Sequence, residues 1–260
     1  MAVWIAGLPV RAGSDRSVAN IDNDYAKYLE MNIPMKNHLT DKSSHYSLLL
    51  GVILLILGGC QQTVEKPETE SAFLLPEIVT LEDFRLTNAR LGEFGIDKLK
   101  GKWSLFFFGY THCPDVCPTE LFMMAEMMRA IEKNPSDDVQ PPQVVFVSVD
   151  PQRDTPESLQ QYASFYHPSF IGITGPQSSV DRLAQEMGVF FERVYHHNGE
   201  VLSIKPGEAI PAELESSYLI NHSASIFLLN PEGDFQAIFT PPHDPATMIR
   251  DLAVIQAAWH

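Results

Sequence analysis

Cysteine is scarce in this chain, with three residues among 260: Cys60, Cys113 and Cys117. So few cannot form the disulfide framework of a small secreted protein, and a domain of this length does not need one. Cys113 and Cys117 are separated by only three residues. A single close pair favours chemistry over scaffolding, either as a redox pair or as metal ligands. The structural alternative is two buried cysteines that happen to be close.

Basic residues are also few: 18 Lys and Arg stand against 33 Asp and Glu, which gives a net charge of -15. Residues 1–59 contain five basic and five acidic residues, so residues 60–260 carry the whole negative charge. Such a surface repels phosphate backbones and argues against nucleic-acid binding. The length and the 45% hydrophobic content suffice for one large core, with one or two domains.

A long hydrophobic run is absent. The most apolar stretch, Leu48–Leu57, is much shorter than the roughly 20 residues of a membrane-spanning helix. It has the length of a signal-peptide apolar region, and Lys36 and Lys42 supply the positive flank. It ends in "LGGC", which resembles the lipobox of bacterial lipoproteins and makes Cys60 the expected site of lipidation. The alternatives are an uncleaved signal anchor or a buried helix.

This interpretation predicts how the chain is organised. Met35 is a natural first residue for the signal peptide, so residues 1–34 are expected to be a non-native or mis-assigned extension, followed by a signal peptide over 35–59. Residues 60–77, rich in Glu and Thr, are expected to be the lipidated cysteine and a flexible tether. A single folded domain is expected over 78–260. The mature protein is predicted to lie outside the cytoplasm, on the periplasmic side, with a lipid anchor in a bacterial membrane.

The folded part alternates strands and helices. A hairpin is expected within 84–103, followed by buried strands at 103–110 and 144–150, a short strand at 170–175, and a hairpin at 225–239. Helices are expected at 119–133, 154–167, 176–188 and 244–259, and an inserted hairpin or loop between 189 and 224. This order predicts an α/β fold in which a central mixed sheet is flanked by helices on both faces.

Both thiols follow the first buried strand, at the carboxyl edge where open α/β sheets place their sites. Pro118 biases Cys117 away from helical geometry, so the helix is expected to begin at Pro118. The sulfurs would then lie near its amino end, where the dipole and free N–H groups favour thiolate. Disulfide exchange and metal binding both use that thiolate. Four methionines of the helix (Met123, Met124, Met127 and Met128) fit core packing better than copper binding.

Three stretches in order, "GYTHCPDVCPTEL", "VSVDPQRDTPESL" and "NHSASIFLLNPEGDF", resemble the SCO/SenC family over about residues 78–258. The resemblance implies a thioredoxin-like fold and a role in assembling the dinuclear copper site of cytochrome c oxidase, by delivering copper or by reducing the target cysteines. It further implies that Cys113, Cys117 and His222 are copper ligands. Two thiolates suit soft Cu(I), and the imidazole suits Cu(II) as well. The implied partners are the copper-site subunit of the oxidase and, beyond it, other copper carriers or thiol reductases.

Several other polar residues have roles that the sequence leaves open. Two roles for Asp150 are equally supported. It is either an outer-shell partner or weak ligand of the site, or a residue that serves the Pro151 turn and the cap of the next helix. His112 adjoins Cys113, but neighbouring side chains diverge, so it ranks below His222. Four further histidines are expected to face solvent: His196, His197, His243 and His260.

Two other functions share these residues. Cys113 and Cys117 can form a disulfide, so the chain could be a thiol–disulfide oxidoreductase. Against an enzyme, such proteins usually separate the cysteines by two residues and place a cis-proline before the facing strand, and "HSASIFLL" has no proline. The second alternative is a redox or copper sensor, which binds copper without passing it on.

Overall fold

The computed structural model describes residues 66–136, 138–197, 200–204 and 218–259, which fall within one unit, Val64–His260. The extension, the signal peptide and Cys60 lie outside the described residues. The strands are β1 (Ala72–Val79), β2 (Leu86–Asn88), β3 (Gly92–Phe94), β4 (Ser104–Gly109), β5 (Gln143–Ser148), β6 (Ile171–Ile173), β7 (Phe191–His197), β8 (Glu200–Ile204), β9 (Tyr218–His222), β10 (Ile226–Leu229) and β11 (Phe235–Phe239). The helices are η2 (Ile96–Lys98), α3 (Val116–Lys133), α4 (Pro156–Tyr166), α5 (Gln177–Glu186) and α6 (Pro245–Ala257).

The central sheet has the strand order β1-β11-β10-β4-β5-β6. β4 pairs in parallel with β5, and β5 with β6, whereas β10 is antiparallel to both β4 and β11. All six residues of β4 are buried, as a continuous apolar run in the middle of a parallel pair requires. The predicted mixed sheet is therefore confirmed, and the strand before the thiols lies inside it.

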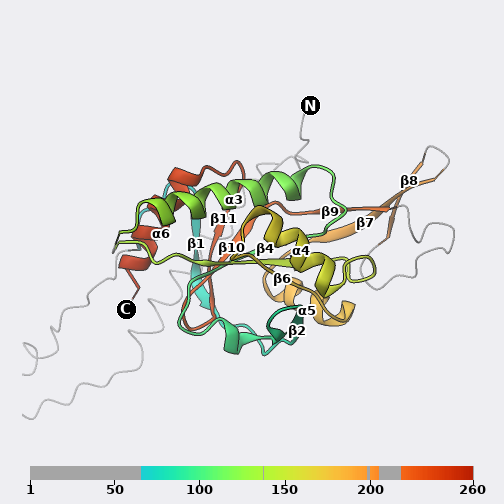
Figure 1. The fold of residues 1–260 in the computed structure, drawn as a ribbon, viewed down its shortest axis with the longest axis horizontal. Helices are drawn as coiled ribbons and strands as arrows, with labels where there is room; N and C mark the ends of the chain where they lie inside the picture. The colour runs from blue at the N-terminus through green and yellow to red at the C-terminus, as the bar shows by residue number, and fades with distance from the viewer. Residues whose placement is uncertain (1–65, 137, 198–199, 205–217, 260) are drawn as a thin grey trace, which may run out of the picture. The chain divides into compact units, whose positions relative to one another are not determined.

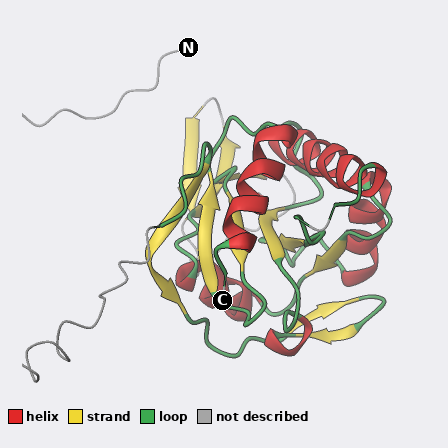
Figure 2. Cartoon of the chain, turned by 90° about the vertical axis from the view of Figure 1, so that its left-hand side faces the viewer, coloured by secondary structure: helices red, strands yellow, loops and turns green. Residues whose placement is uncertain are grey.

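Helices cover one face of this sheet and smaller elements cover the other. α3 and α6 pack together, with α4 beside α3, and Figures 1 and 2 show them over the strands. On the opposite side lie α5 and the predicted hairpin, β2 with β3, joined to the strand layer through the bridge between Thr87 and Thr174. The buried methionines Met124, Met127 and Met128 fill the core below α3, as their spacing predicted.

The insertion forms a second, separate sheet. β7 pairs with β8 on one side and with β9 on the other, giving the order β8-β7-β9. This matches the predicted strand, hairpin and return. Because β9 leads directly into β10 of the central sheet, it brings the end of the small sheet next to the end of β4.

The amino-terminal boundary differs from the sequence prediction. Residues 72–77 were expected to belong to a flexible tether, but they form most of β1, which pairs with β11 as an edge strand of the central sheet. Asp251 of α6 holds its beginning, since the carboxylate accepts hydrogen bonds from the N–H groups of Glu70, Ser71 and Ala72 at 2.7–2.8 Å. The segment is therefore ordered by residues that lie far away in the sequence, and its Glu- and Thr-rich composition does not indicate this. No helix in the described ranges is long and apolar enough to cross a membrane.

Candidate metal centre

The loop that carries Cys113 begins where β4 ends. The Cys113 N–H donates to the carbonyl of Tyr110 at 3.3 Å, which closes a tight turn. Asp154, a fully buried carboxylate after β5, accepts hydrogen bonds from the N–H of Thr111 at 3.0 Å and from Ser148 Oγ at 2.6 Å. The loop is thereby fixed to the neighbouring parallel strand.

Cys117 lies inside α3, not in the turn before it. The helix begins at Val116, so the prediction that it starts at Pro118 was wrong. Pro118 is tolerated because it is the third helical residue, and the first N–H groups of a helix have no intrahelical partner to lose. The Cys117 N–H points to Cys113 Sγ at 3.4 Å, which places the outer sulfur at the helix amino end.

Gly109 leaves room for the inner sulfur. A Cβ at this position would lie 2.6 Å from Cys117 Sγ and 2.7 Å from Cε2 of Phe146. Real Cβ atoms do not approach other atoms so closely. The last residue of β4 therefore has to be glycine if Cys117 is to occupy its fully buried position.

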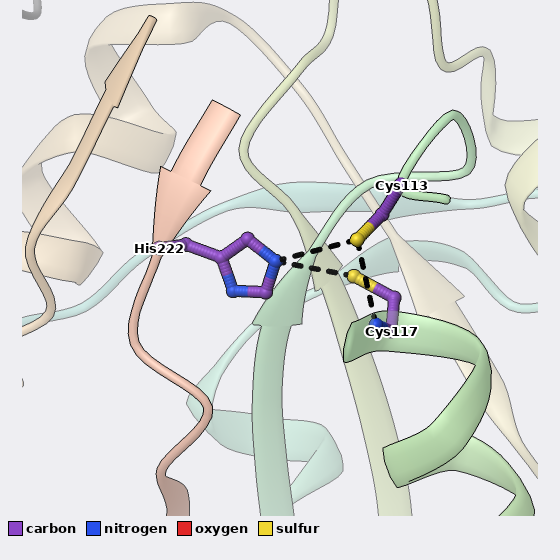
Figure 3. Close-up of side chains that lie close together, drawn as sticks. All are labelled: Cys113, Cys117 and His222. Carbon is purple, nitrogen blue, oxygen red and sulfur yellow. Dashed lines mark hydrogen bonds between the residues drawn. The ribbon is translucent and has the colours of Figure 1, made fainter. Parts of the chain in front are cut away.

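His222 ends β9 and turns its ring toward the thiols (Figure 3). Its Nδ1 lies 3.0 Å from the carbonyl oxygen of Ser223, which can only accept a hydrogen bond, so Nδ1 carries the proton. Nε2 is then left with a free lone pair. It lies 3.2 Å from Cys117 Sγ and 3.9 Å from Cys113 Sγ.

The ligand atoms of Cys113, Cys117 and His222 all lie within 4.8 Å of one another, and both cysteines are free thiols. Two sulfurs and one imidazole nitrogen suit a soft or borderline transition metal such as copper. The thiols come from the loop after β4 and from α3, and the imidazole comes from the end of β9 in the small sheet. A cavity of about 380 Å³ opens on it, lined by Tyr110, Cys113, Pro114, Val116, Leu219 and His222.

The two thiols differ in ionisation. Hydrogen bonding from the Cys117 thiol lowers the pKa of Cys113 to about 3, and the backbone N–H groups of Cys117 and Asp115 act in the same direction, while burial opposes the shift. Burial raises the pKa of the Cys117 thiol far above its usual range, and the neighbouring Cys113 adds to that shift. The partly exposed Cys113 is thus the thiolate and the buried Cys117 its hydrogen-bond donor.

A tyrosine and an arginine hold β9 against the thiol loop. The hydroxyl of Tyr110 accepts a hydrogen bond from the N–H of Ile220 at 3.0 Å, two residues before the histidine. Arg153 donates from Nη1 to the carbonyl of Tyr218 at 3.0 Å, and its guanidinium lies 3.6 Å from the centre of the Tyr218 ring. The position of His222 therefore depends on residues that follow β4 and β5.

Asp150 belongs to this supporting cluster. Its fully buried carboxylate accepts hydrogen bonds from the Tyr218 hydroxyl and from Nε of Arg153. Its oxygens are not among the clustered ligand atoms, which belong to Cys113, Cys117 and His222. Asp150 also closes the predicted turn at Pro151, since its carbonyl accepts hydrogen bonds from the N–H groups of Arg153 and Asp154 at 3.1 and 2.9 Å. The cap of the next helix is Thr155, whose Oγ1 accepts from the Ser158 N–H, so Asp150 does not serve that cap.

Sequence reasoning did not identify Asp154, Tyr110 or Arg153 as supports of the site. The only signal was their place inside the stretches that resemble the family. His112 was rightly ranked low: its half-exposed ring lies beside Thr111 and 3.8 Å from an Asp154 oxygen, outside the cluster of ligand atoms.

The prediction for His243 was wrong. Its side chain is 1% exposed, and Nδ1 lies 2.7 Å from a carboxylate oxygen of Glu120 in α3. That partner precedes it by 123 residues, so no local pattern could indicate the burial. The side chains of His196 and His197, and all of His260, lie outside the described part of the chain.

Several known proteins resemble this chain. A model of the SCO1/SenC family matches residues 76–257. A SCO2-like protein of Rickettsia conorii is 33% identical over 207 residues, which cover 79% of this chain and 92% of that protein.

Two solved structures share the fold. Copper-bound ScoI of Arabidopsis thaliana aligns with a TM-score of 0.57 and 28% identity, covering 68% of this chain and 98% of that one. Apo Sco1 of Thermus thermophilus aligns with a TM-score of 0.56 and 35% identity, covering 74% and 98%. These similarities confirm the predicted thioredoxin-like fold. The chain belongs to the SCO1/SenC family.

Proposed function

We propose that this protein binds copper through Cys113, Cys117 and His222 and assists assembly of the dinuclear copper site of cytochrome c oxidase. The observation that carries the proposal is the convergence of three donor atoms within 4.8 Å, with His222 Nε2 free to bind. The thiolates would hold Cu(I), and the imidazole would add a donor that Cu(II) prefers.

The site is suited to passing copper on. Cys113 is partly exposed and lines the open cavity, whereas Cys117 is fully buried. A partner thiolate can therefore approach from the Cys113 side and replace that ligand first. The copper-site subunit of the oxidase, whose cysteines need both copper and reduced sulfur, is the proposed recipient, with other copper carriers or thiol reductases as further partners.

We further propose that the protein works on the periplasmic side of a bacterial membrane, held by a lipid on Cys60. Support comes from the sequence: a short apolar run with a positive flank ends in a lipobox-like "LGGC". The described residues begin at Lys66, only six positions after that cysteine.

Copper binding by the reduced protein without residues 1–60 tests the site. We expect one equivalent of Cu(II) with an intense sulfur-to-copper absorption band, and loss of both in the Cys113→Ser, Cys117→Ser double variant. Absence of stoichiometric copper in the wild-type chain would overturn the proposal. Transfer to the isolated copper-site domain of the oxidase then separates delivery from sensing.

The asymmetric thiols favour one second function, thiol–disulfide exchange. A low-pKa, accessible Cys113 could attack a substrate disulfide, and Cys117 could then displace the mixed disulfide, leaving this chain oxidised and the substrate reduced by two electrons. Rapid turnover of disulfide substrates by copper-free protein, with no stoichiometric copper binding, would select this function. If copper binding is observed instead, the same protein can both reduce the oxidase cysteines and deliver copper to them.

A further inference from the structure

Three exposed residues of β1 are large and apolar. Phe73 is 58% exposed, Ile78 48% and Val79 39%, so one strand supplies three of the eleven large hydrophobic residues that are exposed in the described part of the chain. β1 lies at the edge of the central sheet, where β11 is its one neighbour among the described strands. A group of exposed apolar residues at a sheet edge indicates a contact surface.

The edge is poorly suited to accept another strand. Its register against β11 shifts between Leu74 and Val79, so residues 75–78 depart from regular pairing. Lys66 Nζ donates to the carbonyls of Leu75 and Pro76 at 3.0 and 3.1 Å, and proline has no N–H to offer. Irregular pairing, a lysine and a proline are the features that block edge-to-edge association. A second copy of this chain is therefore a poor occupant.

Next to this irregular segment the surface is hollowed and amphipathic. A cavity of about 300 Å³ is lined by Lys66, Pro67, Leu74, Leu75, Ile78 and Trp259. Trp259 is partly exposed, and its ring packs edge-on against Trp103 with centroids 5.8 Å apart. Protein surfaces that lie in a membrane interface typically contain apolar side chains, an aromatic ring at the rim and a lysine.

The covalent chain limits where this surface can be. Lys66 lies six positions after Cys60. A fully extended chain spans at most about 3.6 Å per position, or roughly 20 Å over this distance. If Cys60 carries a lipid, as proposed above, β1 cannot leave the neighbourhood of the bilayer. We infer that a membrane seat formed by Phe73, Ile78, Val79 and Trp259 rests on the lipid headgroups of the membrane that holds the anchor.

The pairing of the strands shows where the metal centre lies relative to the seat. Val79 pairs with Phe235, Phe235 with Leu229, and Leu229 with Ser104, the first residue of β4. Three strand spacings of about 4.8 Å therefore separate β1 from β4, roughly 14 Å. The Cys113 loop follows the last residue of β4, so it lies at the end of the sheet away from Val79 and stays open to a partner.

Charge does not favour this contact. Exposed Glu68 and Glu77 outnumber Lys66 beside the apolar residues, and residues 60–260 are acidic as a whole. The seat should therefore bind through apolar burial and not through attraction to anionic lipid, so high salt should leave it intact.

Photo-crosslinking in vesicles tests the inference. The full chain is purified from bacterial membranes and reconstituted into vesicles of phosphatidylethanolamine and phosphatidylglycerol that contain a diazirine phospholipid. We expect label on peptides spanning 66–80 and on Trp259, and none on Phe165 of α4, which is 83% exposed. The label should persist in 0.5 M salt. Phe73→Ser with Ile78→Ser should lower labelling at Trp259 by roughly tenfold, and Phe165→Ser should leave it unchanged.

The mass of the Cys60 peptide, read in the same digest, separates the anchor from the seat. A lipidated Cys60 with no label over 66–80, or with equal label at Phe165, overturns the seat and keeps the anchor. Crosslinks between β1 strands of two copies also overturn it. An unmodified Cys60 with label over 66–80 overturns the anchor and keeps the seat, and an unmodified Cys60 without label overturns both.

Discussion

Nε2 of His222 lies 3.2 Å from the sulfur of Cys117, although 105 residues separate the two in the chain. The contact exists because β9 ends where β4 ends, in a different sheet. Phe107 and Tyr110 flank the imidazole, and the centre of each aromatic ring lies 6.0 Å from the centre of the imidazole. These contacts limit the rotation of the imidazole and keep it directed toward the thiols.

Replacing this histidine should separate the two copper states. Removing a residue that only supports a metal ligand typically lowers the affinity for the metal by about 10–100-fold. His222→Ala removes the proposed ligand itself, so it should weaken Cu(II) binding by about 100-fold or more. Cu(I), held by the two thiolates, should weaken by less than about tenfold. Titration against chelators of each ion measures both. Asn221→Ala, at an exposed position of the same strand, is the matched control, and unchanged Cu(II) affinity in His222→Ala would remove that histidine from the site.

The copper-free protein should show an unusual pH dependence of thiol alkylation. A thiol with a pKa of about 3 is already ionised at pH 5, so the rate at Cys113 should stay nearly flat from pH 8 to pH 5. An ordinary thiol, with a pKa of about 8.5, would slow about tenfold per pH unit over that range. Iodoacetamide labelling followed by mass spectrometry gives the rate, and Cys117 should stay unlabelled throughout because it is buried and protonated.

The Cys117→Ala variant provides the control for this profile. It removes the hydrogen-bond donor that contributes most to the lowered pKa, so alkylation at Cys113 should begin to fall within the same pH range. A profile for Cys113 that is identical with and without Cys117 would contradict the proposed division of roles between the thiols.

Gly109→Ala should damage the metal centre directly. Its Cβ would meet Cys117 Sγ at 2.6 Å, so the sulfur must move or β4 must shift. Gly172→Ala in β6 is a matched control, because its Cβ would collide at 2.8 Å with the backbone of Leu159, away from the thiols. Overpacking of this kind costs about 1–3 kcal/mol. Urea unfolding should show a loss for both variants, and only Gly109→Ala should lose copper affinity.

Asp150 should matter for stability and not for the number of copper ions bound. Removing its carboxylate leaves the guanidinium of Arg153 without its buried counter-ion, a change that costs about 3–5 kcal/mol. Asp150→Ala should therefore unfold at clearly lower urea concentration and still bind one copper ion. Glu157→Ala, an exposed carboxylate seven residues later, should cost less than about 1 kcal/mol. Loss of copper at unchanged stability would instead make Asp150 a ligand.

Local patterns predicted the centre of the fold and resemblance predicted the site. The buried run before Cys113 and the helical spacing after it need only neighbouring residues, and both were predicted within a few positions. His222 is one of several histidines with no distinguishing local pattern. Only its place in the family stretch "NHSAS" singled it out, and the structure then placed it beside the thiols.

What failed in the prediction depends on long-range partners. β1 is ordered by β11 and by Asp251, which lie more than 150 residues later, and its own composition resembles a tether. The side chain of His243, in the loop before α6, is buried beside Glu120 of α3. Cys117 is helical because a helix tolerates proline in its first turn, an exception to the rule that a residue before proline avoids the helix.

The bonds that join β9 to Tyr110, Arg153 and Asp150 do not involve an ion, so the three donor atoms are already gathered when no copper is bound. Binding copper therefore requires little new ordering of the chain. For the same reason the ion can leave without either sheet losing a strand. A site built in this way can be filled and emptied repeatedly while the fold around it stays the same.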